Sequence, residues 1–88
     1  MVVKELRVQN KLGFHARVAS RITRSVSAFQ SSVNVRKDGR RFDLKSVTDV
    51  MMANAKHGDI VTVEVDGPDE ETAAQTLEVL FAEKFGEM

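Results

Sequence analysis

The chain has 88 residues and no cysteine, so it can form one small hydrophobic core but neither disulfides nor thiolate metal sites. Thirteen lysines and arginines balance thirteen aspartates and glutamates, and this formal net charge of zero gives no support for general nucleic-acid binding. No apolar run approaches the ~18 residues that cross a membrane. We expect a single domain over residues 1–88 that is cytoplasmic and monomeric.

The first third of the chain predicts a strand and then a helix. Apolar and polar side chains alternate over residues 2–9, as in a strand that is buried on one face. Residues 10–14 include a turn glycine, and the apolar side chains that follow recur at helical spacing, which predicts a helix over roughly 16–28. The apolar positions of that helix are Val18, Ala19, Ile22, Val26 and Phe29.

The middle of the chain predicts a hairpin followed by a short helix. Apolar and polar residues alternate over 33–36 and again over 41–44, and the Asp-Gly pair at 38–39 is typical of a two-residue hairpin turn. Ser46, followed three residues later by an aspartate, predicts a helix with this serine as its N-cap, and Gly58 is the expected end. The apolar side of that helix consists of Val47, Val50 and Met51.

The last third of the chain predicts the strongest strand, over 60–66, and a final helix. The turn at 67–69 ends in Asp69, the expected N-cap, and Gly86 follows the end of the helix. The buried stripe of this helix consists of Ala73, Leu77, Leu80 and Phe81. The order βαββαβα predicts an α+β domain in which helices cover one face of the sheet, and it leaves the strand order open.

The residues with the most informative chemistry are His15 and Arg17, at the start of the first helix. Four backbone N–H groups there have no intrahelical partner, and the aligned peptide dipoles make that end positive. An arginine in this turn is unfavourable unless an anion lies close by. A neutral imidazole, the amides of Ala16 and Arg17 and a guanidinium therefore suit a phosphate, which the imidazole could also carry covalently. Arg21 and Arg24 extend the cationic stripe along the same helical face.

The stretch 13–20, Gly-Phe-His-Ala-Arg-Val-Ala-Ser, resembles the active-site motif of the HPr family of bacterial phosphocarriers. The resemblance covers essentially the whole chain and includes a second landmark at 44–47. It implies a four-stranded antiparallel open-faced sandwich. It also implies that His15 takes a phosphoryl group on Nδ1 from phosphoenolpyruvate through Enzyme I and passes it to sugar-specific EIIA-type acceptors. Such a protein is a substrate of enzymes and not itself an enzyme, and needs no cofactor.

The resemblance further implies a partner-docking surface, and the chain departs from the family most importantly at Val18. The docking surface would consist of Phe14, Arg21, Arg24, Val47 and Met51, beside the phosphate-stabilising Arg17. The family usually has proline at the position of Val18, where a fixed φ suits an early helical residue. Valine restores one backbone N–H, and we expect looser local geometry there without loss of the chemistry.

Ser46 has two interpretations, one structural and one regulatory. As an N-cap, its hydroxyl satisfies a free backbone N–H at the helix start. As a phosphosite, it would be modified by an ATP-dependent HPr kinase/phosphorylase, as in some members of the family that the chain resembles. Asp49 argues against the second interpretation, because its charge would repel a phosphoserine three residues away.

Two alternative functions remain open on sequence grounds. A phosphocarrier of a nitrogen-related regulatory branch would keep the same chemistry without sugar transport. A small RNA- or ligand-binding α+β module belongs to another class, but the five phenylalanines are too scattered to form a base-stacking surface. His57 is expected at an exposed turn, and two histidines in different elements without a matching carboxylate spacing predict no metal site.

Overall fold

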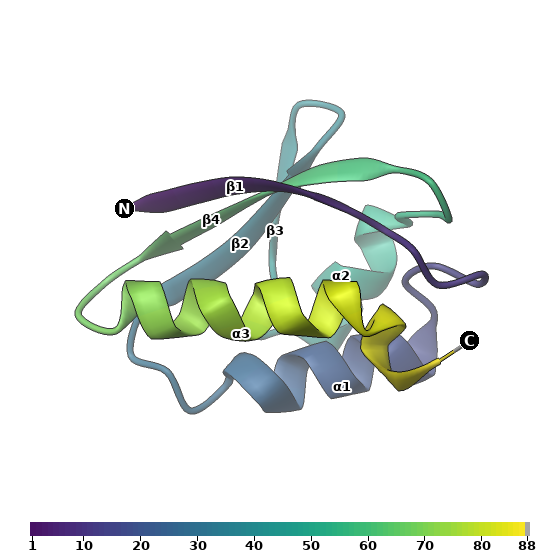
Figure 1. Cartoon of the computed structure of the whole chain (residues 1–88). Coiled ribbons are helices and arrows are strands. Elements are labelled where there is room, and N and C mark those ends of the chain that lie inside the picture. Colours follow the sequence, from purple (N-terminus) through teal and green to yellow (C-terminus); the bar gives the residue numbers. More distant parts are fainter. Residues whose placement is uncertain (88) are drawn as a thin grey trace.

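Four antiparallel strands form one sheet in the computed structural model, which describes residues 1–87 (Figure 1). The strand order is β1-β4-β2-β3, so the first and last strands along the chain are neighbours. The antiparallel sheet implied by the family resemblance is confirmed. The strands are β1 (Val2–Arg7), β2 (Ser32–Lys37), β3 (Arg40–Asp43) and β4 (Ile60–Asp66).

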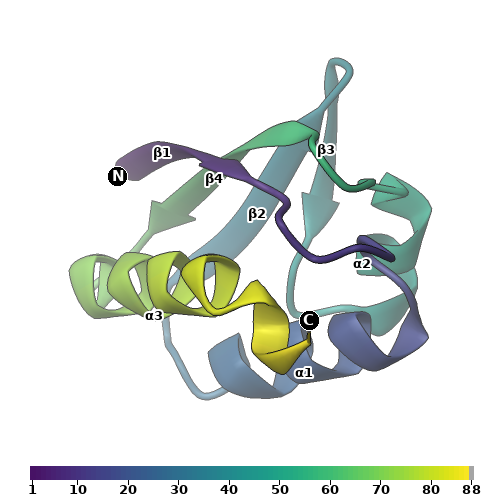
Figure 2. The same cartoon turned by 45° about the vertical axis from the view of Figure 1, so that its right-hand side comes forward.

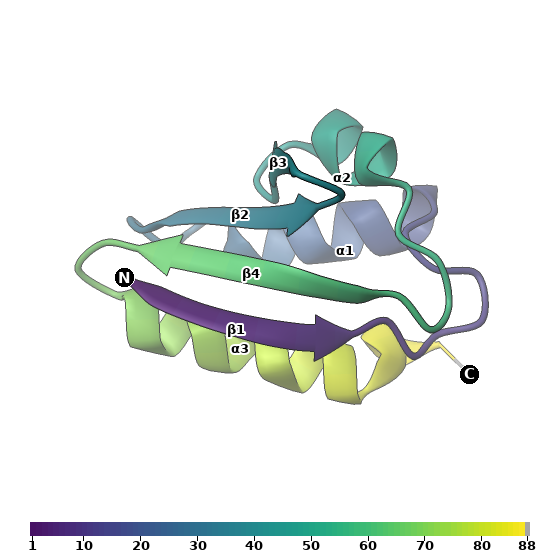
Figure 3. The ribbon, with the colours of Figure 1, turned by 90° about the horizontal axis from the view of Figure 1, so that it is seen from above.

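Three α-helices accompany the sheet and confirm the predicted order βαββαβα and the α+β class. They are α1 (Ala16–Val26), α2 (Val47–Ala53) and α3 (Glu70–Ala82), and a 3₁₀ turn, η1 (Lys84–Gly86), follows the last. The helices α1 and α3 pack against each other beneath one face of the sheet, whereas α2 contacts α1 and β3 (Figure 3). None of the helices within residues 1–87 is both long and apolar enough to span a bilayer.

The hydrophobic core lies between the sheet and the layer of α1 and α3, where the alternating strand residues and the helical stripes meet. Both patterns read from the sequence are largely confirmed. Most of their apolar positions are buried, Val2, Leu6 and Phe29 are partly buried, and the intervening residues are mostly exposed. The fully buried valines are Val8, Val26, Val33, Val35, Val50, Val63 and Val65. This one core is what holds the short helix α1, and therefore its first residues, in a fixed place.

The hairpin between β2 and β3 and the start of α2 follow the sequence prediction, but the end of α2 does not. Asp38 and Gly39 both have positive φ, at 53° and 77°, as a type I′ hairpin turn requires. The Ser46 hydroxyl accepts a hydrogen bond from the backbone N–H of Asp49 at 3.2 Å, which confirms the N-cap. The helix ends at Asn54, which adopts the left-handed conformation with φ 50°, and not at Gly58.

Asp69 precedes α3 as predicted, but its carboxylate does not cap that helix. It accepts hydrogen bonds from the backbone N–H groups of Gln30 and Ser31, both at 2.9 Å, and from the Ser31 hydroxyl. Asp69 therefore ties the loop after α1 to the start of α3. These hydrogen bonds, first of all that from the Ser31 hydroxyl, hold the pKa of the Asp69 carboxyl below its ordinary value.

The lowered pKa of Asp69 predicts how stability depends on pH. A carboxyl whose pKa is lower in the folded state stabilises the fold above its ordinary pKa of about 3.9, and this contribution is lost as the pH falls through the folded value. Asp69→Asn should therefore reduce stability at neutral pH and flatten its decline in acid. Urea unfolding between neutral pH and strong acid measures both effects. Asp38→Asn, at the exposed hairpin turn, controls for the loss of one carboxylate, and equal acid slopes in wild type and Asp69→Asn would contradict the prediction.

The Ser46 cap leads to a second stability prediction. Ser46→Ala should lower the free energy of unfolding by about 0.5–2 kcal/mol, because the N–H of Asp49 loses its acceptor. The control is Ser25→Ala, since the Ser25 hydroxyl only bonds back to the carbonyl of Arg21 within α1. Chemical denaturation of both variants measures the difference. An unchanged stability of Ser46→Ala would mean that water replaces the cap without loss.

Candidate functional site

His15 is the N-cap residue of α1, with extended backbone dihedrals. Its carbonyl accepts the first hydrogen bond of the helix, from the N–H of Ala19 at 2.8 Å, but its ring makes no capping hydrogen bond. The turn before it is fixed by Gly13, whose φ is 66° and where a Cβ would lie 2.2 Å from the carbonyl oxygen of Ala55. Only glycine allows this approach, so the turn places the imidazole at the helix start beside the segment that follows α2.

The imidazole of His15 contacts the carboxylate of Glu87, 72 residues away in sequence. The ring nitrogen Nε2 lies 2.9 Å from Oε1 and 2.8 Å from Oε2, and the two side chains are 24% and 18% exposed. The guanidinium of Arg17 lies on the same carboxylate, with Nε 3.3 Å from Oε2, and is 79% exposed. The structure therefore brings the two predicted site residues together around a third that the sequence patterns did not indicate.

The buried side chain of Asn10 holds both the turn before His15 and the carboxylate of Glu87 in place. The side-chain amide of Asn10 is fully buried and donates hydrogen bonds to the carbonyl of Gly13 at 2.8 Å and to Oε1 of Glu87 at 3.1 Å. Both hydrogens of the amide group are thus used. Asn10 connects the turn that positions His15 to the carboxylate that contacts its ring.

The segment after α3 folds back onto α1 and so places Glu87 next to His15 (Figure 2). Lys84 and Phe85 both have positive φ, at 56° and 55°, a conformation that costs on the order of 1 kcal/mol or more for each non-glycine residue. The Phe85 ring offsets this cost by packing edge-to-face on Phe14 and Phe81, with ring centroids 5.9 and 4.9 Å away. Buried aromatic packing therefore holds a strained backbone in place next to the histidine.

The electrostatics of the site favour an ionised carboxylate at Glu87. The pKa of Glu87 is lowered, chiefly by its hydrogen bond with His15 and further by the amide of Asn10 and the charge of Arg17, while partial burial opposes the shift. The carboxylate also lies at the positive end of α1. The anion that the position of Arg17 calls for is thus present within the protein, so Arg17 alone is weaker evidence for a phosphate than the sequence indicated.

No local pattern could have identified Glu87, because a glutamate after a helix is an ordinary surface residue in sequence. The nearest residue that the sequence did single out is Gly86, expected after the last helix, whose missing Cβ leaves space for the Arg21 guanidinium. A Cβ there would lie 3.2 Å from the guanidinium carbon. The contact between the two ends of the domain depends on tertiary packing.

The members of the expected docking surface differ in exposure. Phe14 is 5% exposed, because its ring packs on Phe81 and Phe85, so it belongs to the core. Val47 and Met51 are exposed on α2, although the sequence pattern placed both on the buried side of that helix. Leu12 and Met52 are two further apolar side chains that are exposed.

His15 lies between two surface hollows of different character. One hollow is apolar and basic and is lined by Leu12, Phe14, His15, Met51, Lys56 and His57, among others. The other lies along α1 and is lined by Arg17, Val18, Arg21, Arg24, Phe85 and Glu87, with Gly86. The cationic stripe predicted from the sequence therefore forms one continuous surface with the segment after α3. Val18 is buried in the core, which anchors the first turn of α1.

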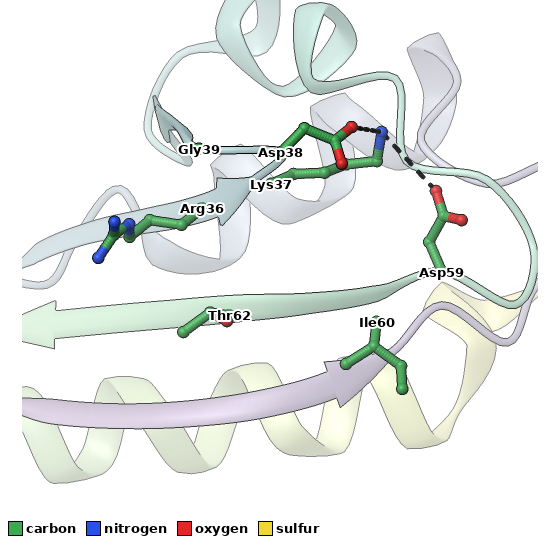
Figure 4. A pocket seen from close by; sticks show the side chains of 7 residues that line it. All are labelled: Arg36, Lys37, Asp38, Gly39, Asp59, Ile60 and Thr62. Carbon is green, nitrogen blue, oxygen red and sulfur yellow. Dashed lines mark hydrogen bonds and ion pairs between the residues drawn. The ribbon is translucent and has the colours of Figure 1, made fainter.

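A third hollow lies where the β2–β3 hairpin approaches the start of β4 (Figure 4). Lys37 projects between two carboxylates there, with Nζ 3.1 Å from Asp38 and 3.9 Å from Asp59. None of the predicted site residues lines it. His57 is exposed as expected, and residues 1–87 hold no cluster of side chains suited to a metal ion.

Comparison with known proteins identifies the family of this chain. The family described as "PTS HPr component phosphorylation site" matches residues 2–83. The chain is 42% identical to the phosphocarrier protein HPr of Cupriavidus necator and 41% identical to that of Xylella fastidiosa, over 99% of this chain and 98% of each relative. The crystal structure of HPr-C-His from Thermoanaerobacter tengcongensis superposes with a TM-score of 0.95 at 34% identity, covering 100% of this chain and 99% of that one. The chain belongs to the HPr family of the phosphotransferase system, whose members are phosphocarrier proteins and not catalytic enzymes.

Proposed function

We propose that this protein accepts a phosphoryl group from phosphoenolpyruvate through Enzyme I, carries it on His15 and passes it to sugar-specific EIIA-type acceptors in the cytoplasm. The observation that carries the proposal is the position of His15. Its partly exposed ring lies at the start of α1, next to the Arg17 guanidinium and to the backbone N–H groups of the first turn, which have no partner within the helix. Membership of the HPr family supports the carrier role.

The chemistry follows from this position. The imidazole attacks the phosphorus of the donor, and the amides of Ala16 and Arg17 and the guanidinium of Arg17 then lie close to the negative oxygens of the transferred group. The stabilisation has to be modest, since a carrier that binds its phosphoryl group too tightly cannot donate it. The exposed guanidinium and the nearby carboxylate of Glu87 fit that requirement.

The surface around His15 supports docking to several partners in turn. Met51 is 45% exposed and Val47 lies on the same short helix, while Arg21 and Arg24 extend the surface along α1. Methionine adapts its shape to different apolar partners, and arginines favour partners with acidic surfaces. We infer a common docking surface for Enzyme I and the acceptors that surrounds the imidazole on both sides.

Regulation at Ser46 is part of the proposal only as a secondary feature. Its hydroxyl already accepts the hydrogen bond from Asp49, and the Asp43 and Asp49 carboxylates accept nearby backbone hydrogen bonds. A phosphate at Ser46 would have to displace the cap and approach these two negative charges. Phosphorylation by an HPr kinase/phosphorylase would therefore change the start of α2, next to the docking surface.

The attachment site is tested by phosphorylation in vitro. With Enzyme I and phosphoenolpyruvate, the protein should gain one phosphoryl group through an acid-labile, alkali-stable bond, as measured by intact mass. His15→Ala should abolish the gain while the fold survives, because the ring caps nothing and is partly exposed. His57→Ala, which changes the other histidine of the chain, should be labelled normally. Undiminished labelling of His15→Ala would place the phosphoryl group elsewhere.

A second experiment separates direct contact by Arg17 from general positive charge. Arg17→Lys keeps the charge but loses the planar guanidinium that can hold the carboxylate through Nε and a phosphoryl oxygen through another nitrogen. Its transfer rate from Enzyme I should fall at both low and high salt. Arg24→Ala, two turns along α1, should lose only docking charge, and its defect should fade as salt screens the interaction. Defects of both variants that vanish together in salt would reduce Arg17 to a docking residue.

A further inference from the structure

We propose that Glu87 is the positioning residue of the phosphoryl site, which selects the nucleophilic nitrogen of His15 and balances the charge of the phosphorylated ring. The inference rests on the proposed function and deepens it. It starts from the observation that both carboxylate oxygens lie within 2.9 Å of the same ring nitrogen, Nε2. An ionised carboxylate has only acceptors, so Nε2 carries a hydrogen whether the ring is neutral or cationic.

The consequence for a neutral ring is a fixed tautomer. With the hydrogen on Nε2, the lone pair available for attack on phosphorus is on Nδ1. The ring makes no capping hydrogen bond, so the helix amides do not occupy that lone pair. Glu87 thus does for His15 what a carboxylate does for a histidine that acts as a base: it orients the ring and leaves one nitrogen reactive.

The charge change during transfer gives Glu87 a second role. The Nδ1–P bond forms as the donor's bond to phosphorus breaks, and the donor leaves with the electron pair of that bond. Nε2 keeps its hydrogen throughout, so the phosphorylated ring is an imidazolium cation whose N–H donates to Glu87. When the Nδ1–P bond breaks in onward transfer, Nδ1 recovers its lone pair and the ring is neutral again. The carboxylate stabilises the cationic intermediate without contacting the phosphoryl group.

The surroundings of Glu87 are built to hold it in this position. Asn10 is buried and directs one amide hydrogen to Oε1, and Arg17 contacts Oε2 through Nε. The ring of Phe85, two residues earlier, is buried in the aromatic cluster although its backbone has a positive φ. Three separate segments therefore hold the carboxylate against the imidazole.

The test uses a small chemical donor, so that docking plays no part. The full chain is treated with potassium phosphoramidate, and NMR of ¹⁵N-labelled product assigns the phosphorylated ring nitrogen. The wild type should give the Nδ1 isomer alone. Glu87→Ala should give both isomers, and the Nε2–H signal of its unmodified ring should disappear through faster exchange with water. A product purely on Nδ1 from Glu87→Ala, with an unchanged Nε2–H signal, would overturn the proposal.

Two further variants separate the hydrogen bond from the charge and from the fold. Glu87→Gln keeps an acceptor oxygen that Asn10 can orient, so the Nδ1 isomer should again dominate, whereas the phosphorylated form should hydrolyse faster without the counter-charge. Both isomers from Glu87→Gln would contradict the tautomer argument. Glu83→Gln changes an exposed glutamate at the end of α3 and should match the wild type in both measurements.

The outcome for Glu87 is distinguishable from the outcome for the proposed function. If Enzyme I and phosphoenolpyruvate fail to label the wild type, the proposed route is wrong, but the chemical donor still reports which nitrogen reacts in each variant. If the wild type is labelled by Enzyme I and Glu87→Ala is labelled on Nδ1 at an equal rate, the route stands and Glu87 is not a positioning residue.

Discussion

The edge-to-face packing of Phe14 with Phe81 and Phe85 is the interaction on which the rest of the site depends. Its three rings have centroids 4.9 to 6.0 Å apart and join the turn before α1 to the end of α3. Such pairs contribute about 0.5–1.5 kcal/mol each beyond the burial of their surface. Phe14 directly precedes His15, and Phe85 lies two residues before Glu87. The packing of these rings in the core therefore brings His15 and Glu87 together.

The charges at the site fit a phosphate carrier better than a protein that binds phosphate tightly. Arg17 and the positive end of α1 attract an anion, but Glu87 already supplies a negative charge at the same place. An incoming phosphoryl group therefore meets an environment whose positive charge is partly balanced. Under the proposed function, it is held by a covalent bond that a partner can break, and not by a tight electrostatic cradle.

The sheet places the remaining parts of the site relative to His15. Because β4 pairs with β1, the chain just before β4 lies against the turn that follows β1, with hydrogen bonds of 2.8 Å between Val8 and both Gly58 and Asp59. The N–H of Phe14 likewise donates to the carbonyl of Ala55 at 2.8 Å. These bonds fix the end of α2 beside the imidazole, so that the exposed Met51 of α2 lines the same hollow as His15.

Features that depend on neighbouring residues could be predicted from the sequence. Alternation, helical spacing and the Ser46 cap identified the four strands and the three α-helices but not the 3₁₀ turn η1, Asp-Gly identified the hairpin, and the motif around His15 identified the family. The partners of polar side chains that bond across the fold became evident only in the packed structure. Asp69 holds the loop at Ser31 and leaves its own helix uncapped, Phe14 is in the core, and Glu87 contacts the histidine. The reason is physical: local periodicity depends on residues a few positions apart, whereas these contacts join segments from 38 to 72 residues apart that only the packed core brings together.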